Sequence, residues 1–454
     1  MERYDSYKDS CVDWIGQIPE HWASTSIKNV LISRQAGSWG EEPTSNKFNT
    51  TCLRIADFDY KKLQFEIKSD YTQRAYDFNE VQTKMLHKGN LLIEKSGGGD
   101  KTPVGRVVLY NLDLEYPMYA NFMERLVVND KFVLPSLMNY LFASLFSHGI
   151  VWKYIKAATG IQNLNISEYF SKEKVFLPPL SEQHAIAAYI DEETGKLDAA
   201  VEKLERMVEV LKERKQLIIS KAVTRGLDDS VPLKDSGVEC IGQIPKHWQE
   251  RKIKFCLENK PNNMKVGPFG SDLKSSDYSI TGYWVYNQRT VLDQNFTSNE
   301  IFVNKKKFQQ LSAFKVFPGD FLITTRGTIG KVAIVPDNYF KGILHPCIIR
   351  FRVDDRILNK YYLRYIFNGS DIVINQILSK SNATTIDAIY SSSLKDIKVT
   401  IPEYNEQCAI VAYLDEETGK LDAAVEKLER MIELLKERKQ ILISDVVTGK
   451  IKIA

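Results

Sequence analysis

Apolar residues recur at three- and four-residue steps through the segment 194–225, and this spacing predicts a long amphipathic helix. Glutamate, lysine and arginine occupy its other faces, Thr194 is the expected N-cap and Gly226 the expected stop. An apolar stripe on an otherwise charged helix predicts a seam for a partner helix. The stripe consists of Leu197, Ala200, Leu204, Met207, Leu211 and Ile218, widened by Val201 and Val208.

This helical segment occurs twice in the chain. Asp191–Met207 returns residue for residue as Asp415–Met431, and conservative replacements continue the copy to Thr224 and Thr448. Because near-identity indicates nearly identical surroundings, we expect the two copies to form an antiparallel pair of helices within one chain. Two unrelated, solvent-exposed helices are the alternative, and they would leave the identity unexplained.

A second repeat precedes the first. The segment Val12–Trp22, leading segment 1, returns with few changes as Val238–Trp248, leading segment 2. The whole chain is therefore a tandem duplication of a leading segment, a globular body and a long helix. Such a duplication gives one polypeptide the approximate two-fold symmetry of a dimer. The polar segment 228–237, which contains Pro and Gly, is predicted to link the halves.

The two globular bodies share a predicted layout but little sequence. In body 1, apolar residues at 91–93 and 104–109 flank a glycine loop, and body 2 repeats the pattern at 321–323 and 329–334. Both patterns predict strand–loop–strand units. Helical stretches are expected to follow at 134–158 and 359–378, and then Pro-ended strands at 175–178 and 399–402.

A short helix over about residues 181–193 is expected to lead into the first long helix, since Ser181 can cap it and an acidic residue follows. The predicted fold class is mixed α+β: two α/β bodies in pseudo-two-fold tandem, joined by two long antiparallel coiled-coil helices. The predicted division is 1–180 for body 1, 181–227 for the first helical region, 228–403 for body 2 and 404–454 for the second helical region.

Composition limits the classes of protein. The chain has 454 residues, 43% of them hydrophobic and 26% charged, which suits two or three globular domains. The net charge of +3 permits a nucleic-acid partner only through locally concentrated positive charge. Six cysteines without a Cys-x-x-Cys pair predict free thiols in the cytoplasm. No apolar run approaches 18 residues, so no membrane span or signal peptide is predicted.

Segments of the chain that resemble catalytic or cofactor-binding motifs lack the spacing or the residues that these motifs require. Gly327–Lys331 has two residues between its glycines where a phosphate loop has four, and Ser96–Gly99 lacks the dinucleotide pattern. Leu177–Leu180 is apolar and lacks the Asn or Asp and the aromatic residue of a methyltransferase tetrapeptide. His21 and His247 recur in the leading segments without nearby ligand partners, which favours packing or capping over a metal site. The sequence predicts no catalysis and no bound cofactor.

Basic side chains and glycines gather in the predicted loops of both bodies. Glycines let backbone N–H groups approach phosphates, and Lys and Arg neutralise them. Asn and Gln can pair with adenine, and Arg with guanine. For a single Lys the alternative is a solvated surface charge, and for Gln162 or Asn163 an ordinary turn residue. The predicted DNA-binding residues are Lys95, Gly97, Gly98, Lys101, Arg106, Gln162 and Asn163 in body 1, and Lys274, Arg289, Arg326 and Lys331 in body 2.

Taken in order, these segments resemble the specificity subunits of type I restriction–modification systems, over nearly the whole chain. The resemblance rests on both leading segments and on several further motifs that recur in this order. They are Lys88–Ile93 with its glycine loop, Gly267–Lys274, Gly319–Lys331, Thr159–Leu164, the Glu-Gln pairs at 182–183 and 406–407, and both copies of Leu211–Gln216 (Leu435–Gln440).

The resemblance implies that the bodies are target-recognition domains, each reading one half of a split, asymmetric site in double-stranded DNA. It implies docking of two methyltransferase (modification) subunits, which methylate adenine, and of restriction subunits through the complex. S-adenosylmethionine, ATP and Mg are then expected on the partner subunits and not on this chain. Body 2 has Ser381–Thr385 where body 1 has Gly160–Leu164, so the role of this string is implied mainly for body 1.

Three alternatives stay open. The specificity subunit of a type IIB-like restriction enzyme would have the same features and would differ in its neighbouring genes. A two-headed adaptor whose bodies bind proteins would lack a steep salt dependence of binding to duplex DNA. A stand-alone DNA enzyme is disfavoured by the missing acid/base and cofactor motifs.

Overall fold

The computed structural model describes residues 3–99, 102–158, 160–380 and 388–453. The chain divides into two compact units, unit 1 with Met1–Glu205 and Glu429–Ala454, and unit 2 with Arg206–Leu428. Each unit thus contains one body, the start of one long helix and the end of the other. The predicted linear boundaries divide the sequence differently, since they keep each helix whole.

The two long helices are α4 (Leu180–Arg225) and α10 (Tyr404–Val447). The prediction of a separate short helix at 181–193, with Thr194 as the N-cap of the next, was wrong. Ile186 and Ile190 are fully buried and continue the apolar stripe upstream, so nothing ends the helix there. The Thr194 hydroxyl donates to the carbonyl of Ile190 at 2.7 Å, a bond that threonine makes inside a helix. The helix ends before Gly226, whose φ of +76° confirms the predicted stop.

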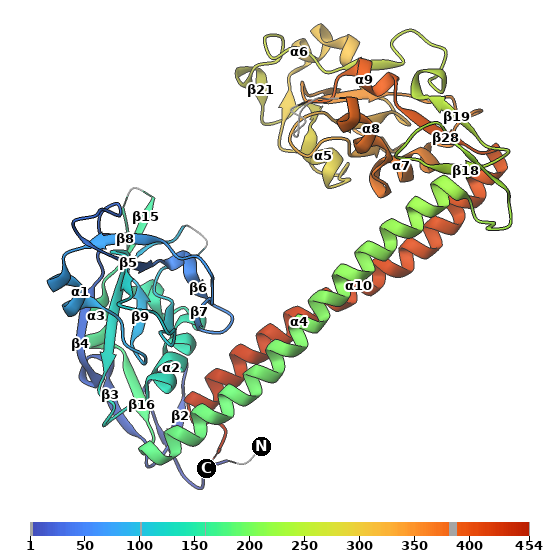
Figure 1. The fold of residues 1–454 in the computed structure, drawn as a ribbon. Helices are drawn as coiled ribbons and strands as arrows, with labels where there is room; N and C mark the ends of the chain where they lie inside the picture. The colour runs from blue at the N-terminus through green and yellow to red at the C-terminus, as the bar shows by residue number, and fades with distance from the viewer. Residues whose placement is uncertain (1–2, 100–101, 159, 381–387, 454) are drawn as a thin grey trace. The chain divides into compact units, whose positions relative to one another are not determined.

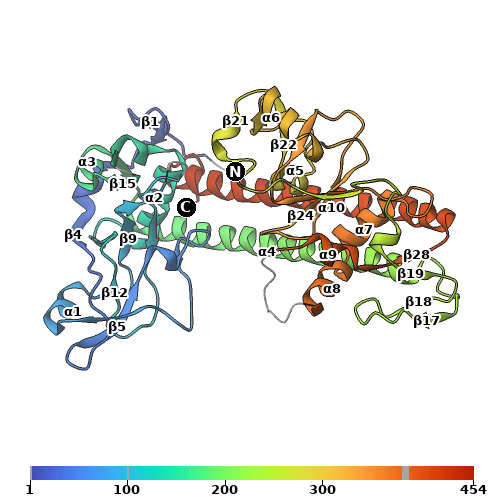
Figure 2. The same cartoon turned by 90° about the horizontal axis from the view of Figure 1, so that it is seen from above.

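Within each unit the two helices run antiparallel (Figure 1, Figure 2). In unit 1, Lys439 pairs with Asp198 at 2.6 Å and Lys436 with Glu205 at 3.1 Å. Residue numbers therefore rise along one helix as they fall along the other. In unit 2, Lys215 pairs with Asp422 at 2.6 Å. Asp198–Lys439 and Asp422–Lys215 are the same pair of repeat positions. The predicted antiparallel pairing is therefore confirmed.

The buried seam of α4 differs in detail from the predicted stripe. Val201 and Val208 are each 7% exposed and lie at its centre, whereas Met207 is 44% exposed. Val201, Leu204, Val208 and Leu211 alternate by three and four residues, which is the 3.5-residue repeat of a coiled coil. A coiled-coil seam buries a narrower strip of the helix surface than a helix packed on a globular core does, so Met207 lies outside the seam.

Body 1 of unit 1 is a mixed α/β fold. Its main sheet has the order β4-β13-β9-β11-β7-β6, smaller sheets have the orders β12-β5-β8 and β10-β15-β14, and β16 pairs with β3. Leading segment 1 contributes β2 (Gln17–Pro19), which pairs with β1 (Tyr7–Asp9). The other strands of body 1 are β3 (Ala23–Ser26), β4 (Leu31–Ala36), β5 (Phe48–Leu53), β6 (Phe58–Asp59), β7 (Gln64–Phe65), β8 (Gln73–Tyr76), β9 (Leu91–Glu94), β10 (Ser96–Gly97), β11 (Val107–Leu109), β12 (Met118–Tyr119), β13 (Met123–Val128), β14 (Ile155–Ala158), β15 (Ile161–Leu164) and β16 (Lys174–Leu177). The helices of body 1 are α1 (Phe78–Lys84), α2 (Pro135–Ser147) and α3 (Ile166–Lys172).

Body 2 has the corresponding layout. Its sheets have the orders β20-β27-β24-β25 and β21-β23-β22-β26, β17 pairs with β18, and β19 with β28. Its strands are β17 (Leu233–Asp235), β18 (Gln243–Pro245), β19 (Gln249–Lys252), β20 (Met264–Val266), β21 (Tyr278–Ser279), β22 (Tyr283–Tyr286), β23 (Phe302–Val303), β24 (Phe321–Thr324), β25 (Val332–Ile334), β26 (Gly342–Leu344), β27 (Ile348–Phe351) and β28 (Lys398–Ile401), and its helices are α5 (Gln288–Leu292), α6 (Lys305–Gln310), α7 (Lys360–Gly369), α8 (Ile372–Lys380) and α9 (Ser391–Lys395).

The predicted strand–loop–strand units are confirmed, since β9 pairs antiparallel with β11 and β24 with β25. The predicted helical stretch 134–158 was too long. Helix α2 ends at Ser147, Gly149 adopts a left-handed φ of +70°, and a 3₁₀ turn leads into β14. A glycine with this backbone conformation ends the helix and frees the chain for a strand. Among the described residues, no helix is both long and apolar enough to span a membrane.

Candidate nucleic-acid interface

The glycine loop of body 1 is held by β15. Ser96 and Gly97 of β10 lie opposite Asn163 and Gln162. The Gln162 side chain is 6% exposed; its Nε2 donates to Gly99 O at 2.7 Å and its Oε1 accepts from Val104 N at 3.1 Å. Both groups of this amide are therefore engaged in bracing the loop.

The side chain of Asn163 points to the face of β15 opposite to that of Gln162, because neighbouring side chains of a strand alternate between faces. Its side chain is exposed, and its Oδ1 accepts from the Ser96 hydroxyl at 2.6 Å. Lys95 precedes this pair and is half-buried. The structure thus brings Lys95, Gly97, Gly98 and Asn163 together in the region where β10 pairs with β15. Lys101, also predicted here, lies outside the described residues.

Arg106 lies elsewhere in body 1. Its Nε and Nη2 donate to the two carboxylate oxygens of Glu94 at 2.9 and 2.8 Å, and Glu94 is only 1% exposed. The guanidinium also stacks 3.6 Å from the ring centre of Tyr60. Burial and Glu94 raise the pKa of Tyr60, so its hydroxyl stays a hydrogen-bond donor to that carboxylate. Sequence reasoning missed this partner because Glu94 ends an otherwise apolar strand.

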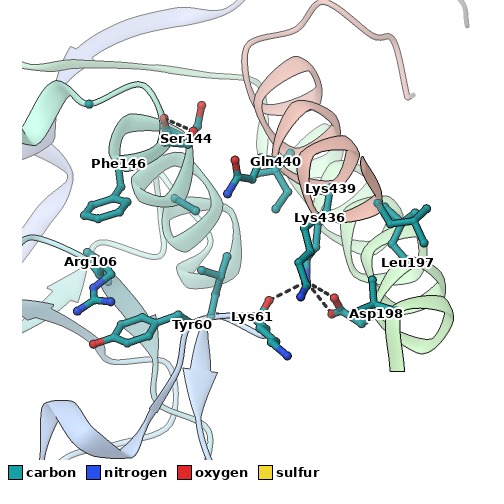
Figure 3. Close-up of a pocket in the computed structure, with 18 of the residues that line it drawn as sticks. Tyr60, Lys61, Arg106, Ser144, Phe146, Leu197, Asp198, Lys436, Lys439 and Gln440 are labelled. Carbon is teal, nitrogen blue, oxygen red and sulfur yellow. Dashed lines mark hydrogen bonds and ion pairs between the residues drawn. The ribbon is translucent and has the colours of Figure 1, made fainter. Parts of the chain in front are cut away.

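Tyr60 and Arg106 line a cavity of about 610 Å³ between body 1 and the paired helices of unit 1 (Figure 3). Phe146 also lines the cavity, and Gln440 of α10 faces it. Gln216, the repeat equivalent of Gln440, instead donates to Asp371 of body 2 at 3.0 Å. Identical helix residues therefore meet different body residues in the two units.

In body 2, the predicted residues lie around the turn between β24 and β25. Arg326 and Gly327 are exposed in this turn, and Gly327 lies against the side chain of Gln288 at the start of α5. Arg289 follows, with its side chain 75% exposed and 3.3 Å from Asp293. The structure thus brings Arg326 and the start of α5 together.

Lys331 and Lys274 occupy the margins of this region. Lys331 Nζ donates to the carbonyl of Asn368 at 3.2 Å, which turns it toward α7. Lys274 is exposed at the end of the Gly267–Lys274 loop. Gly267 packs on the carbonyl of His345, and Thr325 bonds to the carbonyl of Cys347 at 2.9 Å, so the 345–347 segment joins that loop to the β24–β25 turn. The Ser381–Thr385 string lies outside the described residues.

Both leading segments bind the long helices in the same way. His21 Nε2 lies 2.8 Å from Glu182 Oε2, and His247 Nε2 lies 2.9 Å from Glu406 Oε2. These contacts give the two histidines the packing role expected from the sequence. Across the described residues, no group of three or more His, Cys, Asp or Glu side chains is placed to hold a metal ion.

Comparisons with known proteins agree on one class. Residues 245–434 match the family model of the type I restriction modification DNA specificity domain. The chain is 20% identical to the specificity subunit of the type I restriction enzyme EcoKI of Escherichia coli K12 and 20% identical to that of StySPI of Salmonella potsdam, covering 96% of this chain and 90% of each relative. The match to the EcoBI specificity subunit of Escherichia coli is 22% identical, with 61% of this chain and 58% of that relative.

The fold has a solved counterpart. A chain from work on complex assembly and conformational transition of the type I R-M system superposes with a TM-score of 0.68 at 17% identity, covering 96% of this chain and 99% of the other. This likeness concerns the fold, and the sequence comparisons agree with it. Residues 245–434 thus match the DNA specificity domain of type I restriction–modification systems, and nearly the whole chain is similar to the specificity subunits of two type I restriction enzymes.

Proposed function

We propose that this chain is the non-catalytic DNA-recognition subunit of a type I restriction–modification complex. Each body reads one half of a bipartite, asymmetric site in duplex DNA, and the paired helices set the spacing and bind two methyltransferase subunits. S-adenosylmethionine, ATP and Mg belong to the partner subunits. One observation carries the proposal: the contacts that hold body to helix are repeated in both units, whereas the exposed polar loops differ.

The repeated contacts are specific. The buried amide of Gln183 bonds to Leu134 N, Phe132 O and Pro178 O, and Gln407 makes the same three kinds of bond in unit 2. Tyr140 donates to Asp191, and Tyr365 donates to Asp415. Two differing bodies seated by one set of contacts are suited to reading two different half-sites in one common way.

The docking of two identical partners is supported by exposed apolar positions that also recur. On α4, Met207, Val210 and Leu217 are 44%, 59% and 70% exposed. Their repeat equivalents on α10, Met431, Leu434 and Ile441, are 40%, 55% and 52% exposed. Packing within the chain does not require apolar residues at solvent-facing positions, and exposed apolar patches typically mark interaction sites. Two like patches suit two copies of one partner.

The spacing role is tested by lengthening both helices. We expect four residues inserted after Arg206 and four after Arg430 to add about 6 Å to each helix, from a rise of about 1.5 Å per residue. With about 3.4 Å per base pair, the gap between the half-sites should grow by one or two base pairs. Methylation mapping of the variant complex measures the gap.

Insertion into α4 alone is the control, because it shifts the helices out of register and should abolish assembly. If the gap between the half-sites did not change when both helices were lengthened, the helices would not set the spacing and would serve only to bind the partner subunits.

DNA contact is tested at the β24–β25 turn. We expect Arg326→Ala to weaken binding of the assembled complex to duplex DNA. A phosphate contact should lower the salt slope by about one, while a base contact should cost about 1–3 kcal/mol at one position. Fluorescence anisotropy at several salt concentrations measures both quantities.

Arg356→Ala is the matched control. Arg356 is 86% exposed and pairs with Asp354, in a segment that Gln407 ties to the start of α10 through Ile357. Equal binding and equal salt slopes for both variants would exclude the β24–β25 turn from the interface. A wild-type complex that binds duplex DNA without salt dependence would favour the protein-binding adaptor instead.

A further inference from the structure

We propose that the outer face of the β10-β15-β14 sheet enters the DNA major groove, where Asn163 reads an adenine. This inference rests on the proposed function and names the reading element of body 1. Figure 1 shows β15 at the end of body 1 opposite β3 and β16. Within this sheet, β14 and β15 form a two-stranded antiparallel ribbon, which has the width that the major groove of B-DNA admits.

The register defines which side chains share this outer face. Asn163 lies opposite Ser96 on one side and opposite Lys156 on the other. Residues directly opposite each other in antiparallel strands point to the same face. Ile161 joins them, because it lies two positions before Asn163 on the same strand. Lys156 and Asn163 are exposed, and Ile161 is 50% exposed.

The hydrogen bonds of Asn163 suit base reading. Ser96 Oγ donates to its Oδ1, and Ser96 itself is 8% exposed, so a largely buried hydroxyl on the neighbouring strand fixes the amide. A carbonyl oxygen has two lone pairs, which leaves one to accept from adenine N6 while Nδ2 donates to N7. An amide held in this way has less orientational freedom to lose on binding.

The neighbours of Asn163 complete a reading surface. Ile161 offers an apolar contact of the kind that thymine methyl groups accept, and Lys156 offers a cation to the phosphate backbone. On the other face of β15, Gln162 fastens the glycine loop to the hairpin through Gly99 and Val104. Of the two adjacent amides, one therefore shapes the element and the other is free to read.

The test removes a single acceptor atom from the DNA. For the complex assembled with its methyltransferase, each adenine of the body 1 half-site is replaced in turn by 7-deazaadenine, which lacks N7 but still pairs with thymine. With wild-type protein, 7-deazaadenine at one position of the half-site should lower the affinity for the DNA, whereas the other positions should have little effect. The loss should be at most about 5- to 150-fold, which is what a bidentate base contact contributes. With Asn163→Asp, the remaining affinity should be insensitive to deaza substitution at that position.

Asn29→Asp is the matched control, since Asn29 is also exposed and bonds a hydroxyl, that of Thr25, next to β3. It should retain the full deaza sensitivity of the wild type. Lys156→Ala should weaken all sequences alike and lower the salt slope by about one.

The inference is overturned if no adenine of the half-site responds to N7 removal, or if Asn163→Asp responds as the wild type does. Thermal unfolding and subunit assembly, measured on the same samples, show that the variant is folded. The proposed function fails differently: exchanging the bodies, as described below, would leave the recognised site unchanged.

Discussion

Replacing Gln183 by leucine is expected to destabilise unit 1 by about 3–5 kcal/mol. The side chain is fully buried; its Oε1 accepts from Leu134 N at 2.9 Å, and its Nε2 donates to Phe132 O and Pro178 O at 2.8 and 2.9 Å. Leucine can satisfy none of these three backbone groups. Each buried group left without a partner costs about 1–3 kcal/mol. Urea denaturation of the purified chain measures the loss.

Gln407→Leu is the repeat equivalent and should give a similar loss in unit 2, where Gln407 bonds to Asn359 N, Ile357 O and Pro402 O. Gln82→Leu, on the exposed surface of α1, should change stability by less than about 0.5 kcal/mol. If Gln183→Leu were as mild as Gln82→Leu, these amides would not be what holds body to helix.

The sequence predicted the large-scale organisation because the duplication gives each element a second copy. The copied segments Asp191–Met207 and Asp415–Met431 indicated the paired helices, and the described ion pairs confirm their antiparallel direction. The exact seam was harder to predict. Met207 is apolar and correctly spaced for a broad stripe, but a coiled coil buries a narrower one.

The candidate interface could be predicted only as a region. Gln162 and Asn163 are adjacent amides with equal chemistry, and only the pairing with β10 shows that one is buried and one exposed. Arg106 has a partner, Glu94, twelve residues earlier on a neighbouring strand. Residues that face each other across a sheet are not evident from their order in the chain. Lys156 and Ser96 were missed for this reason.

A chimera that carries body 2 twice is expected to recognise a symmetric site. The strands that bracket each body pair with each other, Ala23 opposite Leu177 and Gln249 opposite Ile401, so each body leaves the helices and returns at one place. Replacing residues 23–177 by 249–401 therefore joins equivalent positions. Gln216 and Asp415 of the long helices bond to body 2. Their repeat equivalents, Gln440 and Asp191, are available to make the same bonds to the second copy of body 2.

The expected effect is a complete change of one half-site. Two identical readers on helices of approximate two-fold symmetry should read an inverted repeat of the body 2 half-site. The converse chimera, with body 1 twice, should read an inverted repeat of the other half-site and is the matched control. Both chimeras keep the long helices, so the gap should stay close to that of the wild type.

Genome-wide mapping of N6-methyladenine, in cells that express the chimera with the partner methyltransferase, tests the central claim most directly. If each body reads one half-site, the methylated sequence should become an inverted repeat in which the body 2 half-site is retained and the body 1 half-site is lost. Methylation of the original asymmetric site by the chimera would contradict the claim, because the bodies would then not carry the specificity.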